Sequence, residues 1–221
     1  ALPGLRESIL ELLPGVSPGF RGLRNEHLPV LAEVWGERSM ERLEAFGLRY
    51  LNADLCPWFF SVWGSVMTVP LFKTEERETL RPVGVKSSLV RVLHQRVVTA
   101  NRGPITSYLE PQKLALTKAG GFILVHAVRM MMEEMRNKLG WVAVKIDVSN
   151  AHNEMARASV VEVLEDIPEL KHLAMHAAVC LAGEQGLEAR GKLWGTTREG
   201  LSQGDPEASP WFCLGWHPYV R

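Results

Sequence analysis

Residues 141–153 read W-V-A-V-K-I-D-V-S-N-A-H-N, and their first seven positions form the clearest strand pattern in the chain. Apolar and more polar side chains alternate there, which predicts a strand with one buried face made of Val142, Val144 and Ile146. The pattern ends at Asp147, and a carboxylate at the end of a half-buried strand needs a partner. Metal cations and helix N-termini both supply one, so we expect Asp147 to be either a metal ligand or a helix cap.

A second motif follows at residues 200–210, which read G-L-S-Q-G-D-P-E-A-S-P. Its two glycines, Gly200 and Gly204, allow the backbone to approach a bound molecule closely, and the amide of Gln203 both donates and accepts hydrogen bonds. A Ser-Pro pair then favours the start of a helix directly behind the loop. The motif predicts a binding loop, and an ordinary Gly-Pro loop is the alternative.

The stretch from Ser65 to Arg91 predicts a hairpin, because two β-rich runs, V-M-T-V-P-L-F and L-R-P-V-G-V, flank the polar K-T-E-E-R-E-T. Residues 71–102 carry seven basic and three acidic side chains, a net charge of +4. Lys73 and Arg81 flank the tip of the hairpin, where two cations can clamp phosphate groups. A solvated, charged hairpin explains the same pattern equally well.

Helices dominate the rest of the chain. Apolar residues recur at helical spacing in residues 27–52, which predicts two short helices, and in residues 122–138, where a methionine-rich face predicts core packing. A loop is expected around Gly103 and Pro104, and a second hairpin over residues 187–197. Helices interleaved with a few strands indicate an α+β fold, with the helices packed on a small antiparallel sheet.

The composition limits the class of protein. The 221 residues contain 25 basic and 25 acidic side chains, so a nucleic-acid partner has to be met by a local basic patch. Three widely spaced cysteines predict free thiols and a reducing compartment. Prolines and a glycine interrupt the uncharged stretch 55–72, and no secretory leader is recognisable, so we expect an intracellular protein without a membrane span.

One further set of side chains has metal-ligand chemistry. His172, His176 and Cys180 lie four residues apart on one predicted helix, but successive positions rise by about 6 Å, which is too far for three ligands of one zinc ion. We therefore expect these residues to pack as part of a helix, with partly exposed imidazoles. His94 and His217 stand alone in the sequence and are expected at the surface or at helix ends.

Taken together and in this order, the motifs resemble the reverse transcriptases of non-LTR (LINE-type) retrotransposons. The resemblance rests on Lys73, the R-P-V-x-V run from Arg81, the strand that ends in D-V-S-N-A-H-N, and the run Q-G-D-P-E-A-S-P-W-F. It implies a right-hand polymerase with its fingers and part of its palm. Residues 1–64 would lead into the fingers, residues 65–140 would form the fingers and their connection, and residues 141–221 would form the partial palm.

The resemblance also implies a role for each matched residue. Asp147 would be the first catalytic aspartate and would hold Mg2+ or Mn2+, with two ions bound in the complete domain. Nucleotide binding would involve Lys73, Arg81, Val148, His152, Gln203 and Gly204. Template binding would involve Arg91, Gln112, Gly120 and Gly121. The partners would be an RNA template, a DNA primer and deoxynucleoside triphosphates.

Two features depart from the family. His152 stands where the family has Phe or Tyr, the ring that excludes a ribose 2′-hydroxyl, and the paired-aspartate motif has no counterpart before Arg221. We therefore expect a segment of an RNA-directed DNA polymerase that is inactive by itself. The alternatives are a nucleic-acid-binding remnant without catalysis and, within the enzyme class, a relative of intron maturases or viral RNA-dependent RNA polymerases.

Overall fold

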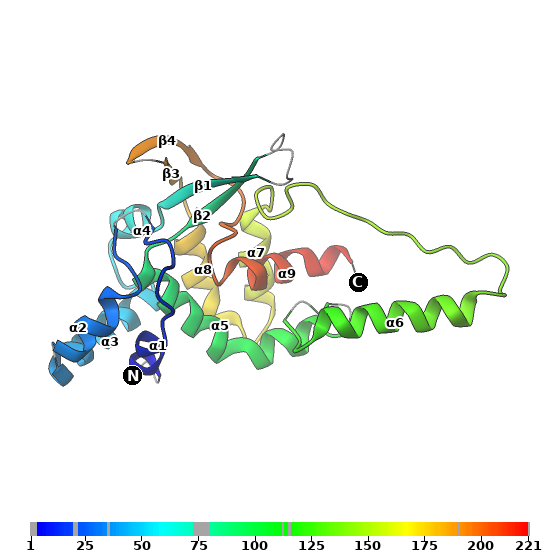
Figure 1. Ribbon diagram of the computed structural model, residues 1–221, viewed down its shortest axis with the longest axis horizontal. Helices are drawn as coiled ribbons and strands as arrows, with labels where there is room; N and C mark the ends of the chain where they lie inside the picture. The colour runs from blue at the N-terminus through cyan, green and yellow to red at the C-terminus, as the bar shows by residue number, and fades with distance from the viewer. Residues whose placement is uncertain are drawn as a thin grey trace.

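The computed structural model describes residues 4–19, 22–34, 36–72, 80–111, 113–114, 116–189 and 191–220. The helices in these ranges are α1 (Leu5–Leu10), α2 (His27–Val34), α3 (Gly36–Leu51), α4 (Pro57–Trp63), α5 (Ser88–Leu109), α6 (Gly120–Met135), α7 (Arg157–Asp166), α8 (Ala174–Leu181) and α9 (Ala208–Trp216), with short 3-10 turns η1 (Lys171–Leu173) and η2 (His217–Tyr219). The strands are β1 (Val66–Phe72), β2 (Leu80–Val85), β3 (Gln185–Ala189) and β4 (Lys192–Thr197). The fold class is α+β, as predicted, with a helical body beside one small sheet (Figure 1).

The sheet has its strands in the order β2-β1-β3-β4. Both predicted hairpins are confirmed, since β1 pairs antiparallel with β2 and β3 pairs antiparallel with β4. β1 and β3 run parallel, with Val66 opposite Leu187, so the sheet is mixed and the prediction of a purely antiparallel sheet is wrong. Parallel neighbours need a long crossover connection, and α5 to α8 supply it here.

Helix α5 joins two hydrophobic cores. Its first half packs with α1 to α4, where Leu5, Ile9 and Leu93 are fully buried. Its second half packs with α7, α8 and α9 around Leu164 and Leu214, which are also fully buried. Burial of each side chain of this size stabilises the folded state by about 1.5–3 kcal/mol. Hydrophobic packing therefore anchors both halves of α5.

Helix boundaries differ from the prediction in two places. α5 continues through Pro104, where a loop was expected, because Ile105 and Leu109 are both 1% exposed and anchor its last turns, while the proline removes only one backbone N–H. The two short helices over residues 27–52 are confirmed, and they break where Gly36 adopts φ 68°. No helix in the described ranges is both long and apolar enough to cross a bilayer.

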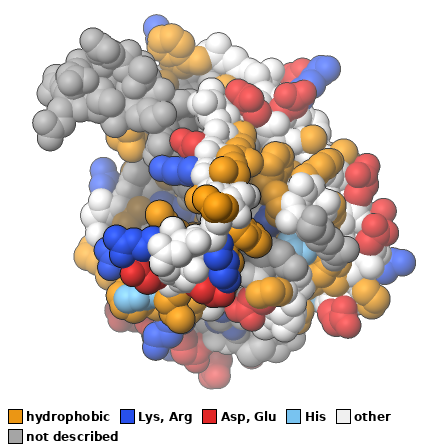
Figure 2. Space-filling view, turned by 90° about the vertical axis from the view of Figure 1, so that its right-hand side faces the viewer, with side chains coloured by type: hydrophobic (Ala, Val, Ile, Leu, Met, Phe, Trp, Pro, Cys, Tyr) orange, Lys and Arg blue, Asp and Glu red, His pale blue; other side chains and the backbone are white. Residues whose placement is uncertain are grey.

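Helix α6 and the extended segment 137–148 project from the body as an arm (Figure 1). Side chains are exposed throughout residues 121–134 and 136–150, and hydrophobic groups are visible on the face from which the arm projects (Figure 2). The predictions of a half-buried strand over residues 141–147 and of a core helix over 122–138 are therefore wrong. A strand needs a second backbone to pair with, and none of the described strands lies beside this segment.

Candidate functional site

The G-L-S-Q-G-D-P loop lies against the S-N-A-H-N turn. The Leu201 N–H donates a hydrogen bond to the His152 carbonyl at 2.6 Å. Gly200 adopts φ 76°, and a Cβ atom at that position would overlap the Asn153 carbonyl oxygen, so this close approach requires glycine. Two of the sequence motifs are thus in direct backbone contact.

The same loop also contacts strand β2. The Gly204 N–H donates a hydrogen bond to the Gly84 carbonyl at 3.1 Å, and a Cβ atom on Gly204 would overlap that oxygen. Gly84 is crowded as well, because a Cβ atom there would lie 3.2 Å from the Ser202 side chain. The loop therefore sits between the R-P-V-G-V strand and the S-N-A-H-N turn, and three motifs of the resemblance meet at one place.

A pocket of about 200 Å3 opens where these segments meet. Its lining includes Thr68 and Gly84 from the sheet and Asn153 and Ser202 from the two loops. The Thr68 hydroxyl oxygen is buried without a hydrogen-bond partner among the described residues. The Gln203 side chain is half-buried, and its amide makes no hydrogen bond to any described residue. The Gln203 amide is therefore free to bind a ligand, whereas the Thr68 hydroxyl is closed off from solvent.

Arg157 fixes the loop from the other side. Its guanidinium donates hydrogen bonds of 2.8–3.3 Å to five acceptors, which are the Gln185 amide oxygen and the carbonyls of Leu181, Gly183, Glu199 and Gly200. The side chain is only 7% exposed. Arg157 therefore holds the end of α8, the start of β3 and the loop together, although the sequence motifs assign it no role.

His152, which replaces the aromatic ring of the family, packs on α9. Its imidazole stacks on Phe212 with ring centroids 4.7 Å apart and an interplanar angle of 21°. Partial burial lowers the pKa of His152 below its usual value. Val148 lines a second pocket, of about 270 Å3, together with Phe212 and Trp216. Two of the residues expected at the nucleotide therefore lie beside α9.

Asp147 lies in the exposed arm rather than at the end of a half-buried strand, so that prediction is wrong. Neither Asp147 nor Gln203 lines either of the two pockets just described. Lys73 and the side chain of Arg81 lie outside the described residues, and the backbone of Arg81 pairs with Leu71 in the β1–β2 hairpin. The structure thus brings the loop, the turn and β2 together and leaves Asp147 on the arm.

Arg91, one of the residues expected to bind template, is engaged within the protein. Its guanidinium donates hydrogen bonds to the Ser17 carbonyl at 2.9 Å and to Asn25 Oδ1 and Ser88 Oγ at 3.1 Å. These contacts hold the glycine-rich N-terminal loop on the start of α5. The charge of Arg91 is therefore already partnered by three acceptors.

The other expected template residues lie at or near the start of α6. Gly120 is buried, and a Cβ atom there would overlap the Leu114 carbonyl oxygen, so it is required for packing. Gly121 is exposed and has no atom within 4 Å of the position of a Cβ. Gln112 lies outside the described residues.

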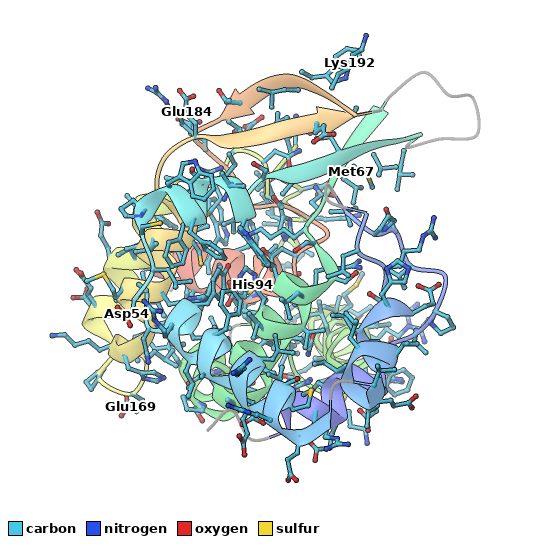
Figure 3. The ribbon with its side chains drawn as sticks, turned by 90° about the vertical axis from the view of Figure 1, so that its left-hand side faces the viewer. Asp54, Met67, His94, Glu169, Glu184 and Lys192 are labelled. Atoms are coloured by element: carbon cyan, nitrogen blue, oxygen red, sulfur yellow. The ribbon has the colours of Figure 1, made fainter. Side chains whose placement is uncertain are left out.

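A buried polar network anchors the acidic residues of the loop (Figure 3, where His94 lies inside the body). Asp205 lies between two cations, with Lys86 Nζ at 2.8 Å and His94 Nδ1 at 2.7 Å from its carboxylate oxygens. Glu207 Oε1 lies 2.9 Å from His176 Nε2. None of these five side chains is more than 7% exposed. The loop is therefore held to the start of α5 and to α8 by buried charges.

Tyr50 and Cys180 extend this network. The Tyr50 hydroxyl lies 2.8 Å from His94 Nε2 and 3.4 Å from Cys180 Sγ. Cys180 Sγ lies 3.6 Å from Nδ1 and 3.8 Å from Nε2 of His176. Tyr50 and Cys180 belong to the first hydrophobic core, whereas Leu181 beside them belongs to the second, so the network occupies the seam between the two cores.

Opposing charges shift the pKa values of the network. Burial by itself would lower the pKa of His94, but the two carboxylates beside it outweigh burial and raise this pKa to about 9. Burial would raise the pKa of Cys180, but His176 lowers it to about 6. Although burial opposes ionisation, His94 and Lys86 hold the pKa of Asp205 well below its usual range. Cations and anions thus stabilise one another in the charged state.

The sequence did not indicate this network. His94 and His176 are 0% and 1% exposed, so the predictions that placed His94 at the surface and His176 partly exposed are wrong. His217 lies at the end of α9, one of the two places expected for it, and is 2% exposed. The physical reason is that Asp205 pairs with His94 across 111 positions of sequence, which no local pattern can show. One feature of the sequence hints at a buried polar network: the two acidic residues Asp205 and Glu207 lie directly before an apolar helix.

Comparison with known proteins adds no family. No protein-family model matches the sequence, and no curated protein is found to match it. The fold gives the class, a mixed α+β domain, and the function has to be argued from the site itself.

Proposed function

We propose that the chain is the fingers and part of the palm of an RNA-directed DNA polymerase of the non-LTR retrotransposon type. Its own part in template-directed nucleotidyl transfer is to hold the primed template and the incoming deoxynucleotide. The observation that carries this proposal is the meeting of three motifs through the backbone hydrogen bonds of Leu201 and Gly204. Gly84 and Gly204 are in contact although 120 positions separate them in the sequence.

Groups suited to nucleic acid lie on the loop and on the β1–β2 hairpin. The Gln203 amide makes no hydrogen bond within the described part of the protein, and amides of this kind recognise base edges. In the sequence, Lys73 directly follows β1 and Arg81 belongs to β2, and the positive charges of both side chains suit phosphate. The basic stretch 71–102 is the local patch that a neutral protein needs to bind a polyanion.

The magnesium ions implied by the resemblance do not fit the described residues. Asp147 is the one carboxylate of segment 141–150 and lies in solvent. Among the described residues, groups of three or more side chains able to hold one ion occur only around His94, and Asp147 belongs to neither group. Two-ion chemistry needs at least two carboxylates. We therefore assign binding to these residues and derive no catalytic step for them.

Equilibrium binding tests the proposal. A fluorescent RNA template annealed to a DNA primer is titrated with the chain at several salt concentrations, and the anisotropy is recorded. We expect affinity to fall steeply with salt, with a slope of about 0.9 per phosphate contact. Replacing Lys73 and Arg81 together by alanine should reduce this slope by about 2, because each lost phosphate contact removes about one unit.

The matched control removes two positive charges elsewhere. Arg38 and Arg42 are exposed on α3, and their double alanine variant should keep the wild-type slope. If the two double variants behave alike, or if a blunt DNA duplex of equal length binds as tightly as the primed template, the proposal is wrong.

Primer extension separates the polymerase from the binding remnant. Extension in magnesium that Asp147→Asn abolishes would show that the chain itself catalyses transfer. Binding of the primed template without extension supports the assignment of binding, and not of catalysis, to the described residues. Among these residues, no two-ion carboxylate site includes Asp147.

A further inference from the structure

Three metal-ligand side chains from two helices meet in the seam between the hydrophobic cores. His94 comes from α5, and His176 and Cys180 come from one face of α8. Their donor atoms all lie within 4.8 Å of one another, and the three residues are 0%, 1% and 6% exposed. His172, the other histidine of this stretch, is exposed and contacts Asn101 instead. The set therefore differs from the one that spacing on a single helix suggests.

One nitrogen of each imidazole faces a carboxylate. His94 Nδ1 faces Asp205 Oδ1 at 2.7 Å, which leaves Nε2 to face the other donors. His176 Nε2 faces Glu207 Oε1 at 2.9 Å, and Cys180 Sγ lies 3.6 Å from Nδ1 and 3.8 Å from Nε2 of the same ring. Tetrahedral zinc with bonds of about 2.05 Å to nitrogen and 2.3 Å to sulfur separates such donors by about 3.6 Å.

The surroundings complete the requirements of a metal site. Metal-bound histidines almost always donate their second N–H to a carboxylate or carbonyl, and Asp205 and Glu207 provide this contact for both imidazoles. The Tyr50 hydroxyl closes the fourth side, 2.8 Å from His94 Nε2 and 3.4 Å from Cys180 Sγ. An oxygen donor is thus present beside two nitrogens and one sulfur.

We propose that His94, His176 and Cys180 bind one zinc ion that fastens α5 to α8, with Asp205 and Glu207 orienting the two imidazoles. A second set, His94 with Asp205 and Glu207, shares one ligand with the first. Its carboxylates are already paired with Lys86 and His176, and two nitrogens with a thiolate match the donor preference of zinc better than oxygen does. This site is separate from Asp147 and independent of the polymerase proposal.

Metal content and cobalt substitution test the site in the wild-type chain. Protein purified without a metal-affinity tag should contain about one zinc per chain by mass spectrometry, because folding and zinc uptake are coupled in buried sites. Removal of zinc by a chelator should lower the melting temperature, and added zinc should restore it. Cobalt(II) bound in place of zinc should show thiolate-to-metal charge-transfer absorption. Zinc-free protein that melts identically with zinc and with chelator would overturn the proposal.

Variants locate the ligands. Cys180→Ser should remove the cobalt–thiolate absorption and weaken zinc binding at least about 100-fold, whereas Asp205→Asn, which changes only the outer contact, should weaken it about 10–100-fold. Cys56→Ser and His172→Ala are the controls, because both residues are exposed and outside the set, and both variants should bind zinc as the wild type does. One zinc ion per chain in Cys180→Ser would also overturn the proposal. If that variant does not fold, the zinc content and melting temperature of the wild-type chain test the proposal instead.

Discussion

Lys86 Nζ lies 2.8 Å from Asp205 Oδ2, and the two side chains are only 3% and 7% exposed. This ion pair joins the loop that carries Gln203 to the residues just before α5. Burial makes the pair sensitive to the loss of either partner, because the remaining charge has no access to water. The Lys86–Asp205 pair is therefore one of the buried contacts that fix the position of the binding loop.

Asp205→Asn should destabilise the protein by about 3–5 kcal/mol, because it leaves the Lys86 ammonium buried beside a neutral amide. Urea unfolding followed by fluorescence, with chelator present in all samples, measures the change. Asp54→Asn is the control, since Asp54 pairs with Arg49 at the surface, and it should change stability by less than about 1 kcal/mol. Equal effects of the two variants would contradict a buried ion pair.

Gly204→Ala should push the loop away from β2, because the new methyl group would overlap the Gly84 carbonyl oxygen. We expect a loss of about 1–3 kcal/mol in unfolding free energy and weaker binding of the primed template. Gly195→Ala on β4 is the control, as a Cβ atom there has no neighbour within 4 Å. The packing argument fails if Gly204→Ala retains both wild-type stability and wild-type affinity.

Arg157→Met should lower the free energy of unfolding by about 3–5 kcal/mol. The substitution leaves four carbonyl oxygens and one amide oxygen, which now accept hydrogen bonds from a single guanidinium, without their donor. Chemical unfolding gives the free energy. Arg129→Met, on the exposed face of α6, should have little effect. A small effect at Arg157 would show that water can replace its hydrogen bonds.

His152 should make the protein less stable in mild acid. Its folded-state pKa is lowered by burial, so the folded protein binds a proton less readily than the unfolded chain, whose histidine pKa is about 6.5. The stabilising contribution is complete above pH 6.5 and is lost as the pH falls below it. His152→Phe should reduce the difference in unfolding free energy between pH 7.5 and 5.5, whereas His126→Phe on the exposed arm should keep the wild-type difference. An unchanged difference in His152→Phe would count against burial of the ring.

Trypsin should cut the arm first. Lys138 and Lys145 lie in an exposed segment without helix or strand, where the backbone can enter a protease site. Peptide mapping of early digests should find cuts after these residues before any cut after buried Lys86 or Arg157. Early cleavage within α5 would instead show that the helical body opens before the arm is reached.

Local patterns predicted the local elements well. The β1–β2 and β3–β4 hairpins were recognisable because alternation and turn residues act over a few neighbouring positions. The two short helices over residues 27–52 followed from helical spacing for the same reason. Local patterns could not predict the contact of β2 with the G-L-S-Q-G-D-P loop, because 120 positions separate Gly84 from Gly204.

Predictions that depended on distant partners were the ones that were wrong. The alternation of Val142, Val144 and Ile146 indicates a strand only if a partner strand is present, and none of the described strands pairs with it. His94 looks like a surface residue until Asp205 and Glu207 supply buried acceptors. The roles proposed for Asp147 and Gln203 as ligands of metal and nucleotide stay predictions.

The parallel pairing of β1 with β3 has a consequence for synthesis of the chain. Val66 and Leu187 are neighbours in the sheet although 121 positions separate them. A ribosome that adds about 5–20 residues per second finishes β1 about 6–24 s before its partner strand exists. Throughout that delay the β1–β2 hairpin carries an open edge that other nascent chains can join. Pairing of β1 with β3 therefore competes with pairing of β1 with another chain until β3 has been synthesised. Chaperones that shield strand edges favour the native pairing.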